Sequence, residues 1–185
     1  MQDRICMVID IDRCWGCQAC ELACKQELEL DVGPRPLRVI DVGPRTIDTQ
    51  LHKDSIPTFC QHCDEPACLA ACPSDAIYRE ADGSVQIDST LCSGCGACEP
   101  ACPFGAIEII AGDVARAVKC TLCFTRRQEG GIPSCAQHCP GRAYTLTNEQ
   151  YLNTIIDKRF FWRTGRIVYV SSKWSTLGGS FPKLF

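Results

Sequence analysis

Sixteen of the seventeen cysteines fall into four groups of four, and each group is compact enough to bind a metal centre. In chain order the groups are Cys14, Cys17, Cys20 and Cys24; Cys60, Cys63, Cys68 and Cys72; Cys92, Cys95, Cys98 and Cys102; and Cys120, Cys123, Cys135 and Cys139. Thiolates are soft ligands that suit zinc, copper(I) or iron–sulfur clusters. The sequence therefore indicates a protein organised around four metal sites.

The spacing of the cysteines favours iron–sulfur clusters. The first and third groups read C-x2-C-x2-C-x3-C, and the last three groups are each followed by proline. Zinc sites more commonly use two well-separated C-x2-C pairs. In the iron–sulfur run, three cysteines bind one cluster and the fourth reaches the other cluster of a pair. We expect four [4Fe–4S] clusters, with zinc sites or disulfides as the alternatives.

The cysteine groups belong to a repeated unit. Residues 9–24 and 87–102 both fit I-D-x-x-x-C-x-G-C-x-A-C-E-x-A-C. The small residues between the cysteines allow backbone amides to approach the cluster sulfides, and such hydrogen bonds tune the reduction potential. The fourth cysteine has entered a helix, so its side chain is expected to point toward the neighbouring cluster.

Short strands and helical turns are predicted to position these loops. Residues 4–11 and 84–88 read as strands that lead into a cysteine loop. Residues 98–102 read as a helical turn that Pro103 ends. The Ala-Ile pairs at 76–77 and 106–107 are expected to start the next strands. This order of elements predicts small α+β units.

A cysteine-free insertion covers residues 25–59. The segment DVGPR occurs at 31–35 and again at 41–45, on either side of the strand-like residues 37–41. The Gly-Pro turns suggest a hairpin or a surface loop. An ordinary insertion and a docking arm for a partner subunit both remain open.

The last part of the chain carries no cysteine group. Thr147 is expected to cap a helix over residues 148–159. Residues 166–172 read as a strand, and the segment that follows reads as an irregular tail. We expect residues 147–185 to form a helix and a partner-docking extension.

Composition restricts the function. The net charge of -3 gives no case for nucleic-acid binding. No run of about 20 apolar residues is present, so no membrane span of its own is expected. The N-terminus lacks a signal-peptide pattern, which predicts a cytoplasmic protein, although export with a Tat-targeted partner stays open. Neither a nucleophile–base pair nor a phosphate loop is evident, so the chain is not expected to be an enzyme by itself.

Three residues near or outside the groups have simple interpretations. Cys6 lies on an apolar strand and is expected to pack as a buried free thiol. His62 and His138 stand beside Cys63 and Cys139, but each group already supplies four thiolates. A hydrogen bond near a cluster is the expected role of each histidine.

Aromatic and cationic residues also flank the groups. Four aromatic residues are expected to shield clusters from water; they are Trp15, Tyr78, Phe104 and Phe124. Four cations could be a solvated face or could balance cluster charge; they are Lys119, Arg126, Arg127 and Arg142. Since four oxidised clusters add about -2 each, the loaded chain would carry about -11.

These motifs resemble a known family. The second group reads C-x2-C-x4-C-x3-C-P and the fourth reads C-x2-C-x11-C-x3-C-P. Their order resembles the four-cluster ferredoxin subunits of molybdenum and tungsten oxidoreductases, among them dimethyl sulfoxide, polysulfide and nitrate reductases and formate dehydrogenases. The resemblance covers residues 4–146 and is most specific at 119–143. The chain departs from it where Cys24 is followed by Lys25 rather than proline, so the first helix is expected to continue.

The resemblance implies ligand sets that cross between groups. These sets are Cys14, Cys17, Cys20 and Cys139; Cys120, Cys123, Cys135 and Cys24; Cys60, Cys63, Cys68 and Cys102; and Cys92, Cys95, Cys98 and Cys72. It also implies two bacterial-ferredoxin-like modules of an α+β fold. The outer module would comprise residues 1–59 and 103–146, with the insertion at 25–59, and the inner module residues 60–102.

The resemblance further implies an electron-transfer subunit. Its partner would be a large tungsto- or molybdopterin subunit, with a bacterial tungsten aldehyde oxidoreductase as the closest match. Benzoyl-coenzyme A reductase complexes and complexes of the dimethyl sulfoxide or polysulfide reductase type are further possibilities. The second redox partner could be a flavin-containing or quinone-linked subunit. A freely diffusing polyferredoxin is the alternative from a different class.

Overall fold

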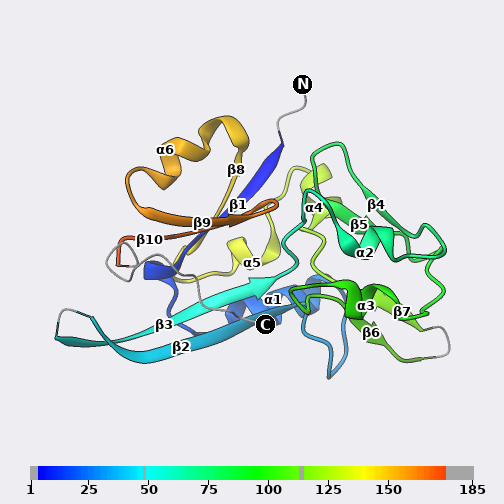
Figure 1. The fold of residues 1–185 in the computed structure, drawn as a ribbon, viewed down its shortest axis with the longest axis horizontal. Helices are drawn as coiled ribbons and strands as arrows, with labels where there is room; N and C mark the ends of the chain where they lie inside the picture. The colour runs from blue at the N-terminus through cyan, green and yellow to red at the C-terminus, as the bar shows by residue number, and fades with distance from the viewer. Residues whose placement is uncertain (1–3, 48, 113–114, 174–185) are drawn as a thin grey trace.

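The computed structural model describes residues 4–47, 49–112 and 115–173. In these ranges, short helices and strands alternate around the cysteine loops (Figure 1). The elements are β1 (Ile5–Asp10), η1 (Ile11–Arg13), α1 (Ala19–Glu27), β2 (Leu37–Ile47), β3 (Gln50–Phe59), α2 (Ala67–Ala70), β4 (Ile77–Arg79), β5 (Val85–Ile87), α3 (Cys98–Ala101), β6 (Glu108–Ile110), β7 (Arg116–Val118), α4 (Phe124–Gln128), α5 (Ser134–Gln137), β8 (Tyr144–Asn148), η2 (Glu149–Tyr151), α6 (Leu152–Ile156), β9 (Phe160–Thr164) and β10 (Ile167–Ser171).

The main sheet joins the two ends of the described chain in the order β8-β1-β10-β9. β1 runs antiparallel to β8 and parallel to β10, with Met7 opposite Ile167. Alternate residues of β1 face opposite sides of the sheet. Met7 and Ile9 pack with the cysteines, whereas Cys6 and Val8 pack under α6. The two central strands are largely apolar, and they end in Asp10 and Ser171, because both faces of the sheet are covered.

The predicted insertion contains a long hairpin. β2 and β3 pair antiparallel, with Leu37 opposite Phe59 at the base of the hairpin. The hairpin extends away from the rest of the molecule (Figure 1). This confirms the hairpin interpretation, but the second Gly-Pro pair is not its turn. The register instead shifts between Val42 and Arg45, so Gly43 and Pro44 lie at an irregularity within β2. The strand prediction for residues 37–41 was too short.

Two helix pairs and two small hairpins surround the cysteine loops. α1 packs against α5, and α2 packs against α3. β4 pairs with β5, and β6 pairs with β7. The strand predicted at 84–88 is β5, and the strands predicted after the two Ala-Ile pairs begin at Ile77 and Glu108. α1 continues to Glu27, as expected when no proline follows Cys24.

The segment after the last cysteine belongs to the sheet. The strand expected at 166–172 is β10, but the helix expected at 148–159 is shorter and consists of η2 and α6. The Thr147 cap prediction is wrong, because Thr147 lies within β8 and pairs with Cys6 of β1. Residues 174–185, which hold the predicted tail, lie outside the described residues.

No helix within the described ranges is both long enough and apolar enough to cross a membrane. The expected cellular compartment stays a prediction.

Candidate metal centres

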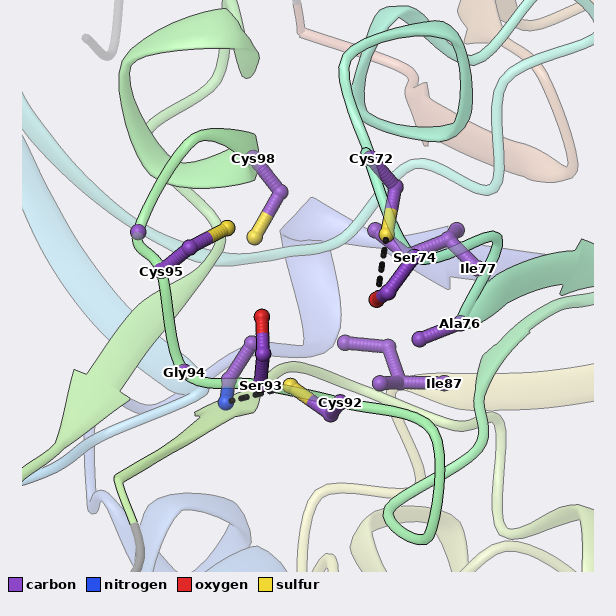
Figure 2. A pocket seen from close by; sticks show the side chains of 12 residues that line it. Cys72, Ser74, Ala76, Ile77, Ile87, Cys92, Ser93, Gly94, Cys95 and Cys98 are labelled. Atoms are coloured by element: carbon purple, nitrogen blue, oxygen red, sulfur yellow. Dashed lines mark hydrogen bonds between the residues drawn. The ribbon is translucent and has the colours of Figure 1, made fainter.

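Four cysteines from two of the groups surround one cavity. Figure 2 shows Cys72, Cys92, Cys95 and Cys98 with their sulfur atoms directed toward a common centre. The cavity holds about 300 Å³ and is walled by Ile77, Ile87 and other small or apolar residues. Cys92 and Cys95 come from the loop before α3, Cys98 is the first residue of α3, and Cys72 follows α2. We refer to this set of four as site 4.

Two further cavities have the same construction. One holds about 360 Å³ and is lined by a set that we call site 2, which comprises Cys24, Cys120, Cys123 and Cys135. The other holds about 330 Å³ and is lined by site 3, which comprises Cys60, Cys63, Cys68 and Cys102. Each combines three cysteines of one sequence group with a helix-borne or helix-terminal cysteine of another.

The remaining four cysteines, Cys14, Cys17, Cys20 and Cys139, are called site 1. Burial is the main cause that raises the pKa of the Cys14 thiol, and the nearby Cys139 and Cys17 thiols raise it further. Burial likewise raises the pKa of Cys20 to about 11, and the neighbouring Cys14 and Cys139 thiols contribute to this increase. Cys139 therefore lies with the first group rather than alone at the end of the fourth.

Backbone amides point at several cysteine sulfurs. Each of the following is an N–H donor to Sγ: Leu122 to Cys120 (3.3 Å), Ala143 to Cys139 (3.3 Å), Ser134 to Cys123 (3.4 Å), Ala106 to Cys102 (3.5 Å) and Ala117 to Cys92 (3.5 Å). Amide donors to thiolate stabilise the more negative form and tune a cluster's potential.

Burial keeps several of the thiols protonated, whereas hydrogen bonds from Ser74 and nearby amides lower the pKa of Cys72 despite an opposing effect of burial. Burial raises the pKa of Cys24 to about 12 and those of Cys63 and Cys68 to about 11. Burial also raises the pKa of Cys120 and of Cys135. Iron supplies the positive charge that reverses this preference and displaces the protons. Cluster assembly at these sites must therefore release protons.

The donor set fits iron–sulfur clusters. All seventeen cysteines are free thiols, so none forms a disulfide. In the described ranges, no three His, Cys, Asp or Glu side chains are arranged around a single metal ion. Each of the three cavities instead offers four thiols around a space of about 300–360 Å³. All-thiolate ligation around a multi-atom centre is the chemistry of [4Fe–4S] clusters.

Cys6 and the two histidines take the roles expected from the sequence. Cys6 is fully buried under α6 and donates a hydrogen bond to Oε2 of Glu149 at 3.4 Å. His62 is also fully buried, and its Nδ1 accepts the Val85 N–H at 2.9 Å. Burial, followed by the nearby Lys119, lowers the pKa of His62, so the ring is neutral. Nδ1 of His138 contacts the carbonyl oxygen of Ser134 at 2.9 Å.

The aromatic residues differ from one another. Phe104 lines the cavity of site 3, in agreement with its shielding role. Trp15 is 71% exposed, and its shielding role stays a prediction. Tyr78 is 41% exposed, and the Arg127 guanidinium lies 5.6 Å from the centre of the Phe124 ring.

The four cations also differ. Arg142 is exposed, as the solvated-face interpretation expects. Arg126 pairs with Glu27 at 3.3 Å, and the nearly buried Arg127 pairs with Asp82 at 2.7 Å. Lys119 is buried, with 2% of its surface exposed.

Sequence reasoning missed Tyr144. It is buried, and its hydroxyl has no hydrogen-bond partner of standard geometry among the described residues. Burial is the main cause that raises the pKa of Tyr144, and the neighbouring Cys20, Cys135 and Cys14 thiols raise it further. Tyr144 occupies the place in CPGRAY that Ile77 and Ile107 occupy in the related repeats, so the repeat alignment could have identified it.

Comparison with known proteins agrees with this site. The family model described as a 4Fe-4S dicluster domain matches residues 51–149. The formate dehydrogenase iron-sulfur subunit of Wolinella succinogenes is 31% identical over 195 residues, which cover 94% of this chain and 96% of the relative. The thiosulfate reductase electron transfer subunit of Salmonella typhi is 35% identical over 142 residues, covering 76% and 73%.

A putative dimethyl sulfoxide reductase iron-sulfur subunit of Halobacterium salinarum is 37% identical over 165 residues, covering 74% of this chain. This chain spans 63% of the length of that relative.

The fold, the thiolate sites and the matches define an iron–sulfur protein. The chain belongs to the family of 4Fe-4S dicluster proteins that includes the iron–sulfur subunits of dimethyl sulfoxide reductase, thiosulfate reductase and formate dehydrogenase. The relatives are named as iron–sulfur or electron transfer subunits, and the sixteen grouped cysteines of this chain match a content of four [4Fe–4S] clusters.

Proposed function

We propose that sites 1 to 4 each bind one [4Fe–4S] cluster and that the chain relays single electrons along them. The observation that carries this proposal is the convergence of cysteines from different sequence groups on shared cavities. The ligand sets are those that the family resemblance implied. When bound, each cluster takes up and releases one electron at a time. The residues of the chain hold the clusters in order and exclude water from them.

The order of the relay is 1-2-3-4. Cys20 of site 1 and Cys24 of site 2 lie one turn apart on α1. Cys60 of site 3 and Cys120 of site 2 belong to the same buried cluster. Sites 3 and 4 share two helices. α2 contains Cys68 of site 3 and is followed by Cys72 of site 4. α3 begins with Cys98 of site 4 and is followed by Cys102 of site 3. Cys17 and Cys95 are exposed, so sites 1 and 4 provide the entry and exit points.

The same geometry supports a nested pair of modules. α1, α5, β1 and β8 surround sites 1 and 2, whereas α2, α3 and the two small hairpins surround sites 3 and 4. We place the boundaries of the inner module at residues 60–118 rather than 60–102. Ala117 of β7 lines site 4, and its amide contacts Cys92.

The partner is a large molybdopterin- or tungstopterin-containing subunit of an oxidoreductase complex. The named relatives include subunits of dimethyl sulfoxide and thiosulfate reductases and of a formate dehydrogenase. These names favour a complex of that type over a tungsten aldehyde oxidoreductase. A flavin or quinone-linked subunit as second redox partner stays a prediction.

Ligand crossing can be tested with pairs of cysteine variants. Under the proposal, Cys24→Ala and Cys123→Ala perturb the same cluster, and Cys139→Ala perturbs the cluster that Cys17→Ala perturbs. The readout is low-temperature paramagnetic resonance at graded potentials. The wild-type protein should contain about 16 iron and 16 sulfide per chain. If Cys24→Ala changes the Cys17 signal and leaves the Cys123 signal intact, the crossed sets are wrong.

Partner binding is tested by purification of the tagged chain from its anaerobic source. A pterin-containing large subunit at fixed stoichiometry is expected. Recovery of a loaded chain alone, which still reduces several unrelated acceptor proteins, would indicate a freely diffusing polyferredoxin instead.

A further inference from the structure

Lys119 lies between two of the cluster sites. Its Nζ donates to the carbonyl oxygen of Cys120 at 3.0 Å and to that of Val85. Cys120 lines the cavity of site 2, and Val85 lines the cavity of site 3. The ammonium group therefore sits at the wall that separates the two cavities.

This ammonium group has no carboxylate partner within the described residues. Both of its hydrogen bonds go to backbone carbonyls, and only 2% of the residue is exposed. Burying a charge costs several kcal/mol unless an opposite charge compensates it. Bound clusters with four thiolates carry that opposite charge.

A second cation adjoins site 3 in the same manner. Arg79 donates through Nη2 to the carbonyl oxygens of Cys63 at 2.7 Å and Asp64 at 2.6 Å. Its Nη1 donates to the carbonyl oxygen of Gly83 at 3.0 Å. Arg79, like Lys119, thus presents its charge to site 3 through hydrogen bonds to neutral groups.

The other sites have a less positive surrounding. At site 2, Arg126 is paired with Glu27 and Arg127 with Asp82, so these charges cancel. At site 1, Asp41 is the charged residue that acts on Cys14 besides the neighbouring thiols. The cavity of site 4 is lined by Ser, Gly, Ala and apolar residues besides its cysteines. Lys119 adjoins site 2 as well as site 3, but site 3 is the one that both Lys119 and Arg79 face.

We propose that Lys119, with Arg79, makes the cluster at site 3 the one with the highest reduction potential, so that an electron on the chain rests there. One-electron reduction takes a cluster with four thiolates from a charge of about -2 to about -3. A cation fixed in a low-dielectric wall favours the more negative state. This inference rests on the ligand sets proposed above.

The test is an anaerobic redox titration of the loaded chain, followed by paramagnetic resonance. The site 3 signal is first assigned as the one that Cys63→Ala and Cys102→Ala both alter. Lys119→Gln removes the charge and keeps an amide donor, whereas Lys119→Arg keeps the charge. Lys25→Gln is the matched control. Lys25 follows Cys24 of site 2 in the sequence, and its Nζ also donates to two backbone carbonyls, those of Asp31 and Pro34.

In wild-type protein, the site 3 signal should appear first as the potential is lowered. Lys119→Gln should reduce the equilibrium constant for reduction of site 3 at least tenfold, which is 59 mV for one electron. Lys119→Arg and Lys25→Gln should leave the site 3 potential near the wild-type value. Arg79→Gln should shift it in the same direction as Lys119→Gln.

Two results would overturn the inference. One is a wild-type titration in which another site is reduced before site 3, which decides the matter even if Lys119→Gln does not assemble. The other is a loaded Lys119→Gln variant with an unchanged site 3 potential. If instead Cys63→Ala and Cys102→Ala alter different signals, the proposed ligand sets fail, and that outcome is distinct from a failure of the Lys119 inference.

Discussion

Tyr144 shows how one side chain can act on a cluster site without being a ligand. Its hydroxyl is buried without a hydrogen-bond partner of standard geometry among the described residues, and the Cys20 thiol is the side chain that acts most on its pKa. A buried hydroxyl that makes no hydrogen bond costs about 1–3 kcal/mol. A thiolate ligand at Cys20 would accept the O–H and remove this cost.

Tyr144→Phe is therefore expected to lower the reduction potential of site 1. In the wild-type protein, the Tyr144 O–H donor stabilises the reduced cluster by about 1 kcal/mol more than the oxidised cluster, and the phenylalanine variant loses this difference. The measurement is the midpoint reduction potential of the site 1 cluster, followed through the paramagnetic resonance signal that Cys17→Ala alters. Tyr78→Phe serves as the control, since Tyr78 is 41% exposed and should leave that midpoint unchanged. A Tyr144→Phe variant with full iron content and the wild-type midpoint would contradict this role.

Cys6 should be unreactive in the folded, loaded protein. It is fully buried, and burial, together with the carboxylate of Glu149, raises the pKa of its thiol to about 11. Since the thiolate is the reactive form, Cys6 stays protonated and unreactive at pH 8.

Alkylation at pH 8 followed by mass spectrometry should find Cys6 unmodified in the native protein. All seventeen cysteines should react after denaturation with an iron chelator. Rapid modification of Cys6 while the clusters are intact would show that the β1–α6 layer opens.

At the scale of elements, the β9–β10 turn fastens the sheet to the loop of site 3. The Arg166 N–H donates to the carbonyl oxygen of Gln61 at 2.9 Å. The nearly buried Arg166 side chain pairs with Glu149 at 3.2 Å and also with Asp64. Gly165 has a φ of +53°, and a Cβ there would overlap the carbonyl oxygens of Gln61 and His62.

Gly165→Ala should consequently destabilise the protein and impair site 3. The left-handed backbone alone costs an alanine about 1–2 kcal/mol, and the overlap adds to this. For a chain of this size, each kcal/mol lowers the apparent Tm by about 2–4 °C.

Gly130→Ala is the matched control, because Gly130 has a φ of +83° and no atom lies within 4 Å of a Cβ there. Apparent Tm values at one scan rate and iron content per chain are the readouts. Equal losses of Tm in the two variants would contradict the proposed contact with the site 3 loop.

The elements also show which features a sequence can predict. Short apolar runs predicted β1, β5 and β10, since such runs are local. Cysteine spacing indicated four groups, whereas the crossed ligand sets came from the family resemblance. The apolar runs did not predict that β10 lies between β1 and β9, because the pairing of Met7 with Ile167 leaves no local pattern. The burial of Lys119 was missed for the same reason, since a charged residue beside a cysteine reads as exposed.

For the whole molecule, the cysteines are part of the core. Cys20, Cys24, Cys60, Cys120 and Cys135 belong to the largest buried cluster of the described residues. Clusters bound between these cysteines would fill the core, so their removal would leave it less well packed, and cavities destabilise a core. The clusters thus contribute to folding as well as to electron transfer.

Iron removal should therefore abolish the cooperative thermal transition, as in other small metal-dependent domains. The measurement is scanning calorimetry of the anaerobic holoprotein, of the chelator-treated chain, and of the chain after reconstitution with iron and sulfide. The reconstituted sample is the control for irreversible damage. A chelated chain that melts cooperatively at the temperature of the holoprotein would show that the fold does not depend on the clusters.

The parallel pairing of β1 with β10 has a consequence for biosynthesis. β1 is synthesised before the strand beside it, which is completed only at Ser171. Under the proposed sets, sites 3 and 4 have all their cysteines once Cys102 has been made, whereas sites 1 and 2 wait for Cys139 and Cys135. A nascent chain can thus accept iron at its middle first, and the two sites that depend on α1 are filled after translation has passed them.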